Sequence, residues 1–179
     1  MSDTTTSEQM LVLGIDPGVA ITGYGLVRLV DGATEPVAYG VITTPVGLPL
    51  SQRLHRLHEE LLALIHLHRP TAASVEELFF ARNARTALSV GHARGVILLS
   101  LAEAGLPVYE YTPLQVKQTI TGYGRADKEQ MQQMVRLLLQ LEQIPQPDDA
   151  ADALAVAICH VHSSSVALRL SESSQGTGR

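Results

Sequence analysis

The pattern of apolar and polar residues changes its period once along this chain, near residue 50. Before that point, apolar residues run together or alternate with polar ones over 10–15, 22–30 and 37–43, and turns rich in Gly or Asp-Gly separate these segments. This pattern predicts three strands that form an antiparallel meander. From 50 to about 68 Leu and Ile recur at helical spacing, and Arg69-Pro70 follows, which predicts a helix that ends there.

Strands and helices alternate over the rest of the chain. A strand that is reached after a helix favours a parallel crossover. The pattern therefore predicts one α/β domain over residues 10–162, with a mixed five-stranded sheet flanked by helices. The sheet would combine the three-strand antiparallel meander with two parallel strands. The further predicted elements are strands over 72–76 and 107–111 and helices over 83–103, 127–141 and 148–162.

Small residues line one side of the predicted helix over 83–103. They are Ala84, Ala87, Gly91 and Gly95. Such a side permits close approach either to the sheet or to a second subunit, and the spacing alone does not decide between them.

Composition is that of a globular protein. Hydrophobic residues make up 45% of the 179 residues, which is too many for a disordered chain, and no apolar run is long enough to span a membrane. Residues 1–9 are polar and contain no export signal, and the single Cys159 cannot form an internal disulfide. We therefore expect a cytoplasmic protein without a membrane partner, with a flexible segment over 1–9 and a disordered tail over 163–179.

Charge is distributed unevenly, which bears on the kind of partner. The net charge of −5 comprises −5 over residues 1–81, +3 over 82–136 and −3 over 137–179. The overall acidity argues against nucleic acid, whereas the basic middle third is compatible with a polyanion. Charge alone leaves both interpretations open.

Four acidic residues lie at positions where a charged side chain is unusual and requires an explanation. Asp16 and Glu76 each end a predicted strand, and ligands of open α/β sheets bind beyond the carboxyl ends of the strands. Asp149 and Asp152 share one face of the last predicted helix, and that face is otherwise apolar. Asp148 is expected to cap this helix, but capping explains Asp152 poorly because it lies deeper in the sequence of the helix.

Carboxylates that point into one site repel one another and require a cation. Oxygen ligands without histidine suit Mg²⁺ or Mn²⁺. Two such ions, roughly 4 Å apart, are the known apparatus for phosphodiester hydrolysis. From spacing alone, unrelated surface acids explain the same residues equally well.

Four blocks of the sequence resemble, in order, the motifs of the RuvC family of bacterial Holliday-junction resolvases. They are LGIDPGVAITGYGLV, VEELFFARNARTALSVGHARGV, QVKQTITGYGRADKEQMQQMV and DAADALAVAICHVH, and together they cover nearly all of residues 10 to 162. The resemblance implies an RNase H-like fold, a homodimer, and an endodeoxyribonuclease that cuts four-way DNA junctions in recombination and repair. It further implies two Mg²⁺ or Mn²⁺ ions per subunit, paired symmetric nicks with 5′-phosphate and 3′-hydroxyl ends, and work with a RuvA–RuvB branch-migration complex.

The resemblance also implies roles for individual residues. It places the family's four metal-binding catalytic acids at Asp16, Glu76, Asp149 and Asp152, the same residues that the strand ends and the helix spacing single out. Two departures from the family pattern add charge without removing a required group. They are Glu77, where an uncharged polar residue is expected, and Asp148, beside Asp149.

The expected contacts with DNA come from one aromatic and several basic residues. Lys117 and Lys128 match family lysines near the active site, and Lys117 is expected to act in catalysis as well. Phe79 matches an aromatic residue near the junction crossover, and Arg82 and Arg85 are candidate contacts to the DNA backbone. Solvated surface positions for the cations, and core packing for Phe79, are the alternatives.

Three other functions are compatible with parts of the sequence. A general nuclease of RNase H type would share the fold but show no preference for branched DNA. A non-catalytic junction-binding module would lack a metal ligand, and none of the four acids is missing. An ATPase of the sugar-kinase type is suggested by GIDPG followed by Thr22-Gly23, but such enzymes use two domains of this kind and 179 residues are too few.

Overall fold

The computed structural model describes residues 10–77 and 84–175, with side chains for residues 10–77 and 87–165. The segment 1–9, expected to be flexible, lies outside the described residues. Within the described ranges, no helix has both the length and the apolar character needed to cross a membrane.

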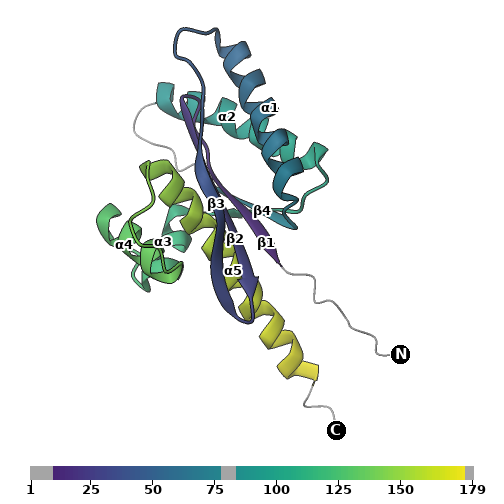
Figure 1. Ribbon diagram of the computed structural model, residues 1–179, viewed down its shortest axis with the longest axis vertical. Coiled ribbons are helices and arrows are strands. Elements are labelled where there is room, and N and C mark those ends of the chain that lie inside the picture. The colour runs from purple at the N-terminus through teal and green to yellow at the C-terminus, as the bar shows by residue number, and fades with distance from the viewer. Residues whose placement is uncertain (1–9, 78–83, 176–179) are drawn as a thin grey trace.

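A five-stranded sheet forms the centre of the molecule (Figure 1). Its strands are β1 (Leu11–Asp16), β2 (Ile21–Val30), β3 (Ala33–Thr43), β4 (Ala72–Glu76) and β5 (Val108–Tyr111). The order across the sheet is β3-β2-β1-β4-β5. The pairs β1–β2 and β2–β3 are antiparallel, and the pairs β1–β4 and β4–β5 are parallel. The predicted mixed sheet, a three-strand meander extended by two parallel strands, is therefore confirmed.

Helices cover both faces of the sheet and create two separate cores. On one face lie α1 (Leu50–His68) and α2 (Ala84–Glu103); on the other lies α5 (Asp148–Gln175), with α3 (Pro113–Thr121) and α4 (Lys128–Leu138) packed against it (Figure 1). The central strand serves both cores, because Leu13 and Ile15 belong to the first and Val12 to the second. A strand that is buried on both faces is apolar without alternation, which explains the continuous apolar run before Asp16.

Helix α5 rests on the sheet at glycine residues. A Cβ added to Gly14 in β1 would lie 2.2 Å from the carbonyl oxygen of Ala153, and one added to Gly23 in β2 would lie 1.9 Å from that of Asp149. Both distances are far shorter than any real contact of a Cβ atom. The backbone of α5 therefore occupies the space that side chains would fill, and its first turns are held directly above β1 and β2.

Helix α3 is the element that the hydrophobic pattern did not predict. Thr112 caps it, since its hydroxyl accepts a hydrogen bond from the Gln115 backbone N–H at 3.2 Å, and the Gln115 side chain accepts one from the Thr112 backbone N–H at 2.8 Å. With Pro113 in the first turn, these residues form a capping box that is legible in the sequence. The helix has nine residues and buries only Val116 and Ile120, so its periodic signal is too short to stand out.

The prediction that the last helix ends at His162 is wrong. Helix α5 continues to Gln175, so residues 163–175, expected to belong to a disordered tail, are helical. Ser163 and Ser165 donate side-chain hydrogen bonds to the carbonyl oxygens four residues earlier, each at 2.8 Å. Serine tends to disrupt helices by competing for backbone groups, but bonds of this kind are compatible with a continuous helix. No Pro or Gly interrupts residues 148–175.

Candidate active site

Two of the four predicted acids lie side by side where neighbouring strands end. β1 and β4 run parallel, and their last paired residues are Ile15 and Val75. Asp16 and Glu76 directly follow these residues and end the two strands. Both are half-buried. The sheet thus brings these two acids together, as their places at the strand ends predict.

The other two acids come from the first turns of α5. Asp16 is paired across the sheet with Gly23, and the backbone of Asp149 lies against Gly23. The start of α5 is therefore adjacent to the end of β1. Asp152, one turn further along, is close enough for its charge to act on both Asp16 and Glu76. We call Asp16, Glu76, Asp149 and Asp152 the acidic cluster.

Burial and repulsion between carboxylates raise the pKa values of Asp16, Glu76 and Asp152. Burial, followed by the charges of Glu76, Asp152 and Asp149, raises the pKa of Asp16 to about 8, although Lys128 opposes the shift. Burial and then Asp152 raise the pKa of Glu76 to about 7, against a lowering by Lys117. Burial is also the main reason that the pKa of Asp152 is raised. Carboxyls with pKa values shifted in this way mark a candidate functional site.

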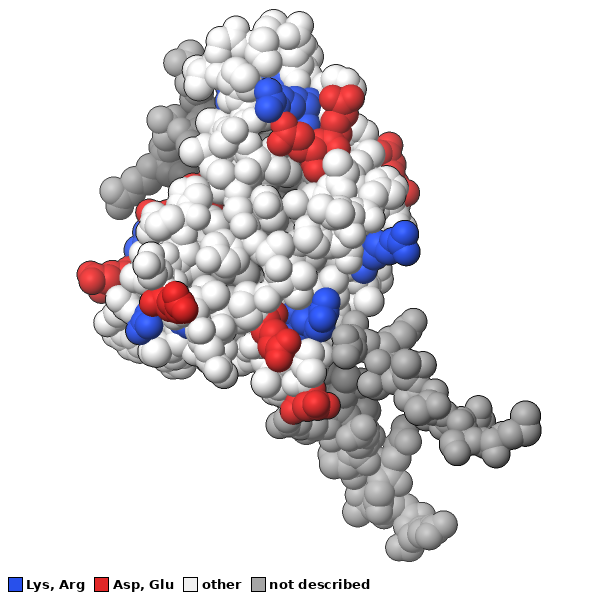
Figure 2. Space-filling model, viewed as in Figure 1, with Lys and Arg blue, Asp and Glu red and all other residues white. Residues whose placement is uncertain are grey.

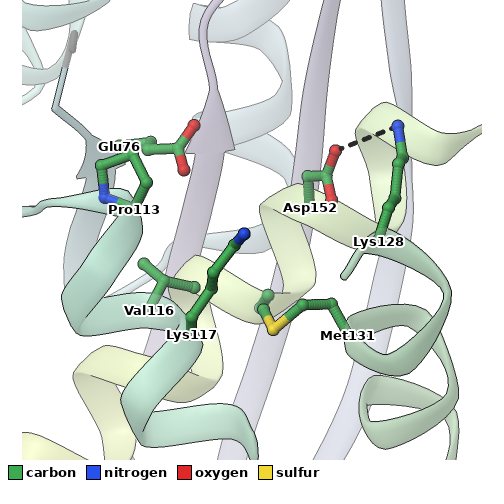
Figure 3. A pocket seen from close by; sticks show the side chains of 8 residues that line it. Glu76, Pro113, Val116, Lys117, Lys128, Met131 and Asp152 are labelled. Carbon is green, nitrogen blue, oxygen red and sulfur yellow. Dashed lines mark ion pairs between the residues drawn. The ribbon is translucent and has the colours of Figure 1, made fainter. Parts of the chain in front are cut away.

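A pocket of about 210 Å³ opens beside the acidic cluster. Glu76 and Asp152 face it from opposite sides, and Lys117 reaches from α3 into the space between them (Figure 3). Lys128, the first residue of α4, lies beside Asp152, with 3.7 Å between its Nζ and the Asp152 Oδ2. The apolar residues of the lining, which the sequence analysis did not identify, are Pro113, Val116, Met131 and Ala155. Because α3 carries two of them and also Lys117, the capping box at its start was the signal that could have located this wall of the pocket.

The structure assigns places to the two predicted lysines but not to the other predicted contacts with DNA. Phe79 and Arg82 lie outside the described residues, and Arg85 is in α2 but its side chain is not among those described. Their contacts with DNA stay predictions. On the face shown in Figure 2, Lys and Arg occur in small groups next to Asp and Glu, and most of the described surface is uncharged. The basic middle third of the sequence therefore does not form one broad basic area on that face.

The donors of the acidic cluster suit a hard divalent cation. Carboxylate oxygens are the ligands that Mg²⁺ and Mn²⁺ prefer, and a cation between these groups would offset the repulsion that contributes to the raised pKa values of Asp16 and Glu76. Among the side chains described, those of residues 10–77 and 87–165, no three His, Cys, Asp or Glu are arranged so that they could hold an ion as they stand. The chemistry of the donors nevertheless fits such an ion.

Comparison with known sequences finds one family for nearly the whole chain. Residues 12–160 match the RuvC family, described as crossover junction endodeoxyribonuclease RuvC. The crossover junction endodeoxyribonuclease RuvC of Desulfitobacterium hafniense (strain DSM 10664 / DCB-2) is 60% identical over 154 residues, which cover 86% of this chain and 93% of that protein.

Solved structures agree with the sequence relatives. The structure of Thermus thermophilus RuvC in complex with a Holliday junction substrate superimposes with a TM-score of 0.82 at 41% identity, covering 87% of this chain and 94% of that one. The yeast mitochondrial Holliday junction resolvase Ydc2 shares the fold alone, with a TM-score of 0.59 at 16% identity and coverage of 83% and 77%. The mixed five-stranded sheet with helices on both faces is that of the RNase H-like resolvases. Within this class, the chain belongs to the RuvC family of crossover junction endodeoxyribonucleases. The predicted fold class and family are thereby confirmed.

Proposed function

We propose that this protein resolves four-way DNA junctions by paired nicks, one made by each subunit of a homodimer. The observation that carries the proposal is the acidic cluster, in which burial and repulsion raise the pKa values of Asp16, Glu76 and Asp152, beside a pocket lined by Lys117 and Lys128. The substrate class follows from the family, since the T. thermophilus relative is described in complex with a Holliday junction substrate. The activity would serve recombination and repair in the cytoplasm, together with a RuvA–RuvB branch-migration complex.

In this reaction the acidic cluster and Lys117 would have separate roles. The acidic cluster would hold two Mg²⁺ or Mn²⁺ ions, which when bound supply an activated water and positive charge at the scissile phosphate. Lys117, which lies between Glu76 and Asp152, is placed to pair with a phosphate oxygen that gains charge as water adds to phosphorus. The bond between phosphorus and the 3′ oxygen then breaks, which leaves a 3′-hydroxyl and a 5′-phosphate.

The exposed side of α2 supports a homodimer. Leu88 and Leu99 on this helix are 63% and 56% exposed, whereas Ile97, on the side facing the core, is buried. Exposed large apolar residues on one helix face are typical of an interaction surface. A Cβ at Gly95, between the two leucines, would meet no atom within 4 Å, so another chain has room to approach. A two-fold dimer formed here would match the symmetry of a four-way junction.

The proposal is tested by replacing Asp16 with asparagine. The variant keeps the size of the side chain but removes the charge at the end of β1, so junction cleavage in Mg²⁺ should fall below detection. Asp31→Asn is the matched control, because Asp31 is exposed in the turn between β2 and β3 and should leave cleavage unchanged. Cleavage is measured on a labelled four-way junction and, separately, on a labelled linear duplex and a labelled RNA–DNA hybrid of the same sequence.

The outcomes distinguish the proposed function from its rivals. If Asp16→Asn cuts as fast as the parent, the acidic cluster is not the catalytic site. If linear duplexes or RNA–DNA hybrids are cut as fast as the junction, the protein is a general nuclease. If the parent binds junctions but cuts none in Mg²⁺ or Mn²⁺, it is a non-catalytic binding module.

A further inference from the structure

Asp148 connects the first turns of α4 and α5 through both of its carboxylate oxygens. Its Oδ1 accepts a hydrogen bond from Gln132 Nε2 at 2.9 Å, and its Oδ2 lies 2.9 Å from Lys128 Nζ. Lys128 and Gln132 are four residues apart on α4 and therefore share one face of that helix. Asp148 was expected to cap α5, but its carboxylate oxygens are directed at these two side chains of α4.

This arrangement decides which carboxylate the Lys128 ammonium approaches more closely. Its Nζ is 2.9 Å from the Asp148 Oδ2 but 3.7 Å from the Asp152 Oδ2 (Figure 3 shows the second pair). The hydrogen bond from Gln132 fixes the orientation of the Asp148 carboxylate, so that its other oxygen faces Lys128. Lys128 thus forms its shorter ion pair with Asp148 and a longer one with Asp152.

A stabilising role does not explain this network. The side chains of Lys128 and Asp148 are 56% and 49% exposed, and ion pairs between exposed side chains contribute little to folding. The network does, however, adjoin a member of the acidic cluster. An ammonium group paired closely with Asp152 would occupy the oxygens that a divalent cation needs.

We propose that Asp148 is a positioning residue that draws the Lys128 ammonium toward itself and so lengthens its ion pair with Asp152, which leaves Asp152 more available to a divalent cation. This inference rests on the proposed function, because it takes the acidic cluster to be a metal site. Without the charge of Asp148, Lys128 would pair more closely with Asp152, and a metal ion would have to displace it. The same geometry leaves the Lys128 ammonium beside the acidic cluster, where it could pair with a DNA phosphate.

A simpler explanation is that Asp148 attracts the metal ion only by its negative charge. The two explanations differ in their dependence on Lys128. If Asp148 acts by charge alone, its removal weakens metal binding to the same extent whether or not Lys128 is present. If Asp148 positions Lys128, the effect of its removal largely disappears once Lys128 is gone.

Mn²⁺ binding to the full chain without DNA, measured by titration calorimetry, separates the explanations. The variants are Asp148→Asn, Lys128→Met and their combination, with Glu129→Gln as a control that removes one exposed charge from the same turn of α4. We expect Asp148→Asn to raise the dissociation constant about fivefold or more in the parent, and less than about twofold in the Lys128→Met background. Lys128→Met alone should tighten binding, and Glu129→Gln should leave it nearly unchanged.

Equal effects of Asp148→Asn in both backgrounds would overturn the inference and leave the metal site intact. A different result would overturn the proposed function itself. If the parent does not bind Mn²⁺, or if Asp16→Asn binds it as tightly as the parent does, the acidic cluster is not a metal site. The inference about Asp148 then fails as well. Coupling between residues 128 and 148, together with loss of binding in Asp16→Asn, supports both.

Discussion

Replacing Gly23 by alanine tests how the active site is assembled. The new Cβ would lie 1.9 Å from the carbonyl oxygen of Asp149 and 2.5 Å from its carbonyl carbon. Both are backbone atoms, so no side-chain rotation relieves the contact. Ordinary van der Waals contact begins at 3.4 Å, and the start of α5 would therefore have to move from β2 by about 1.5 Å, the difference between 3.4 Å and 1.9 Å.

This displacement should affect activity far more than stability. Overpacking of this kind costs about 1–3 kcal/mol, and a domain with a stability of about 5–15 kcal/mol remains folded after such a loss. Asp149 and Asp152 would move with the helix, whereas Asp16 and Glu76 would stay with the sheet. A misplacement of about 1 Å can cost about 100-fold in rate. We therefore expect junction cleavage to fall by about two orders of magnitude in a protein that is still folded.

Two measurements on the same samples check this expectation. Urea unfolding followed by circular dichroism gives the change in free energy, and single-turnover cleavage of a four-way junction at saturating protein gives the rate. Gly47→Ala is the matched control, because a Cβ at Gly47 would meet no atom within 4 Å. If Gly23→Ala has the stability and the cleavage rate of the parent, the backbone of α5 does not lie in close contact with Gly23. A rate that falls only in proportion to the unfolded fraction would refute the argument from displacement.

Three further predictions concern charge, association and helix capping. In EDTA, the free energy of unfolding should fall as the pH rises from about 5 to about 8, because the raised pKa values of Asp16 and Glu76 make the folded state retain protons that the unfolded chain releases near pH 4. Urea titrations across this range measure the slope, and a slope that is as steep in Asp16→Asn as in the parent would contradict this origin. Leu99→Asp should convert a dimer to monomers in a sedimentation experiment. Leu67→Asp, at a 76% exposed position on α1, should not. If the two variants behave alike, the exposed side of α2 is not the dimer interface. Thr112→Ala removes the cap of α3 and should lower the free energy of unfolding by about 1 kcal/mol, and an unchanged urea midpoint would show that the cap is not used.

Local sequence was sufficient to predict most of the fold. The order of strands and helices followed from periodicity, because each segment carries the pattern of the surface that it buries. β1 is the clearest case, since an apolar run without alternation is what burial between two layers requires. Errors arose where local signals were short or ambiguous. Helix α3 has too few buried residues to show a period, and the serines after His162 suggested a tail although their hydroxyls bond within the helix.

At the candidate site, what the sequence determines and what the tertiary structure determines can be separated residue by residue. The sequence by itself determined that Asp16 and Glu76 end strands and that Asp149 and Asp152 share a helix face. Only the tertiary structure decided that these acids meet, because their convergence depends on β1 and β4 being neighbours and on α5 lying against glycine in the sheet. It also decided that Lys117 enters the pocket and that Lys128 lies closer to Asp148 than to Asp152. Periodicity records whether a segment is buried, but the approach of two segments depends on the shapes of both surfaces, which no local pattern contains.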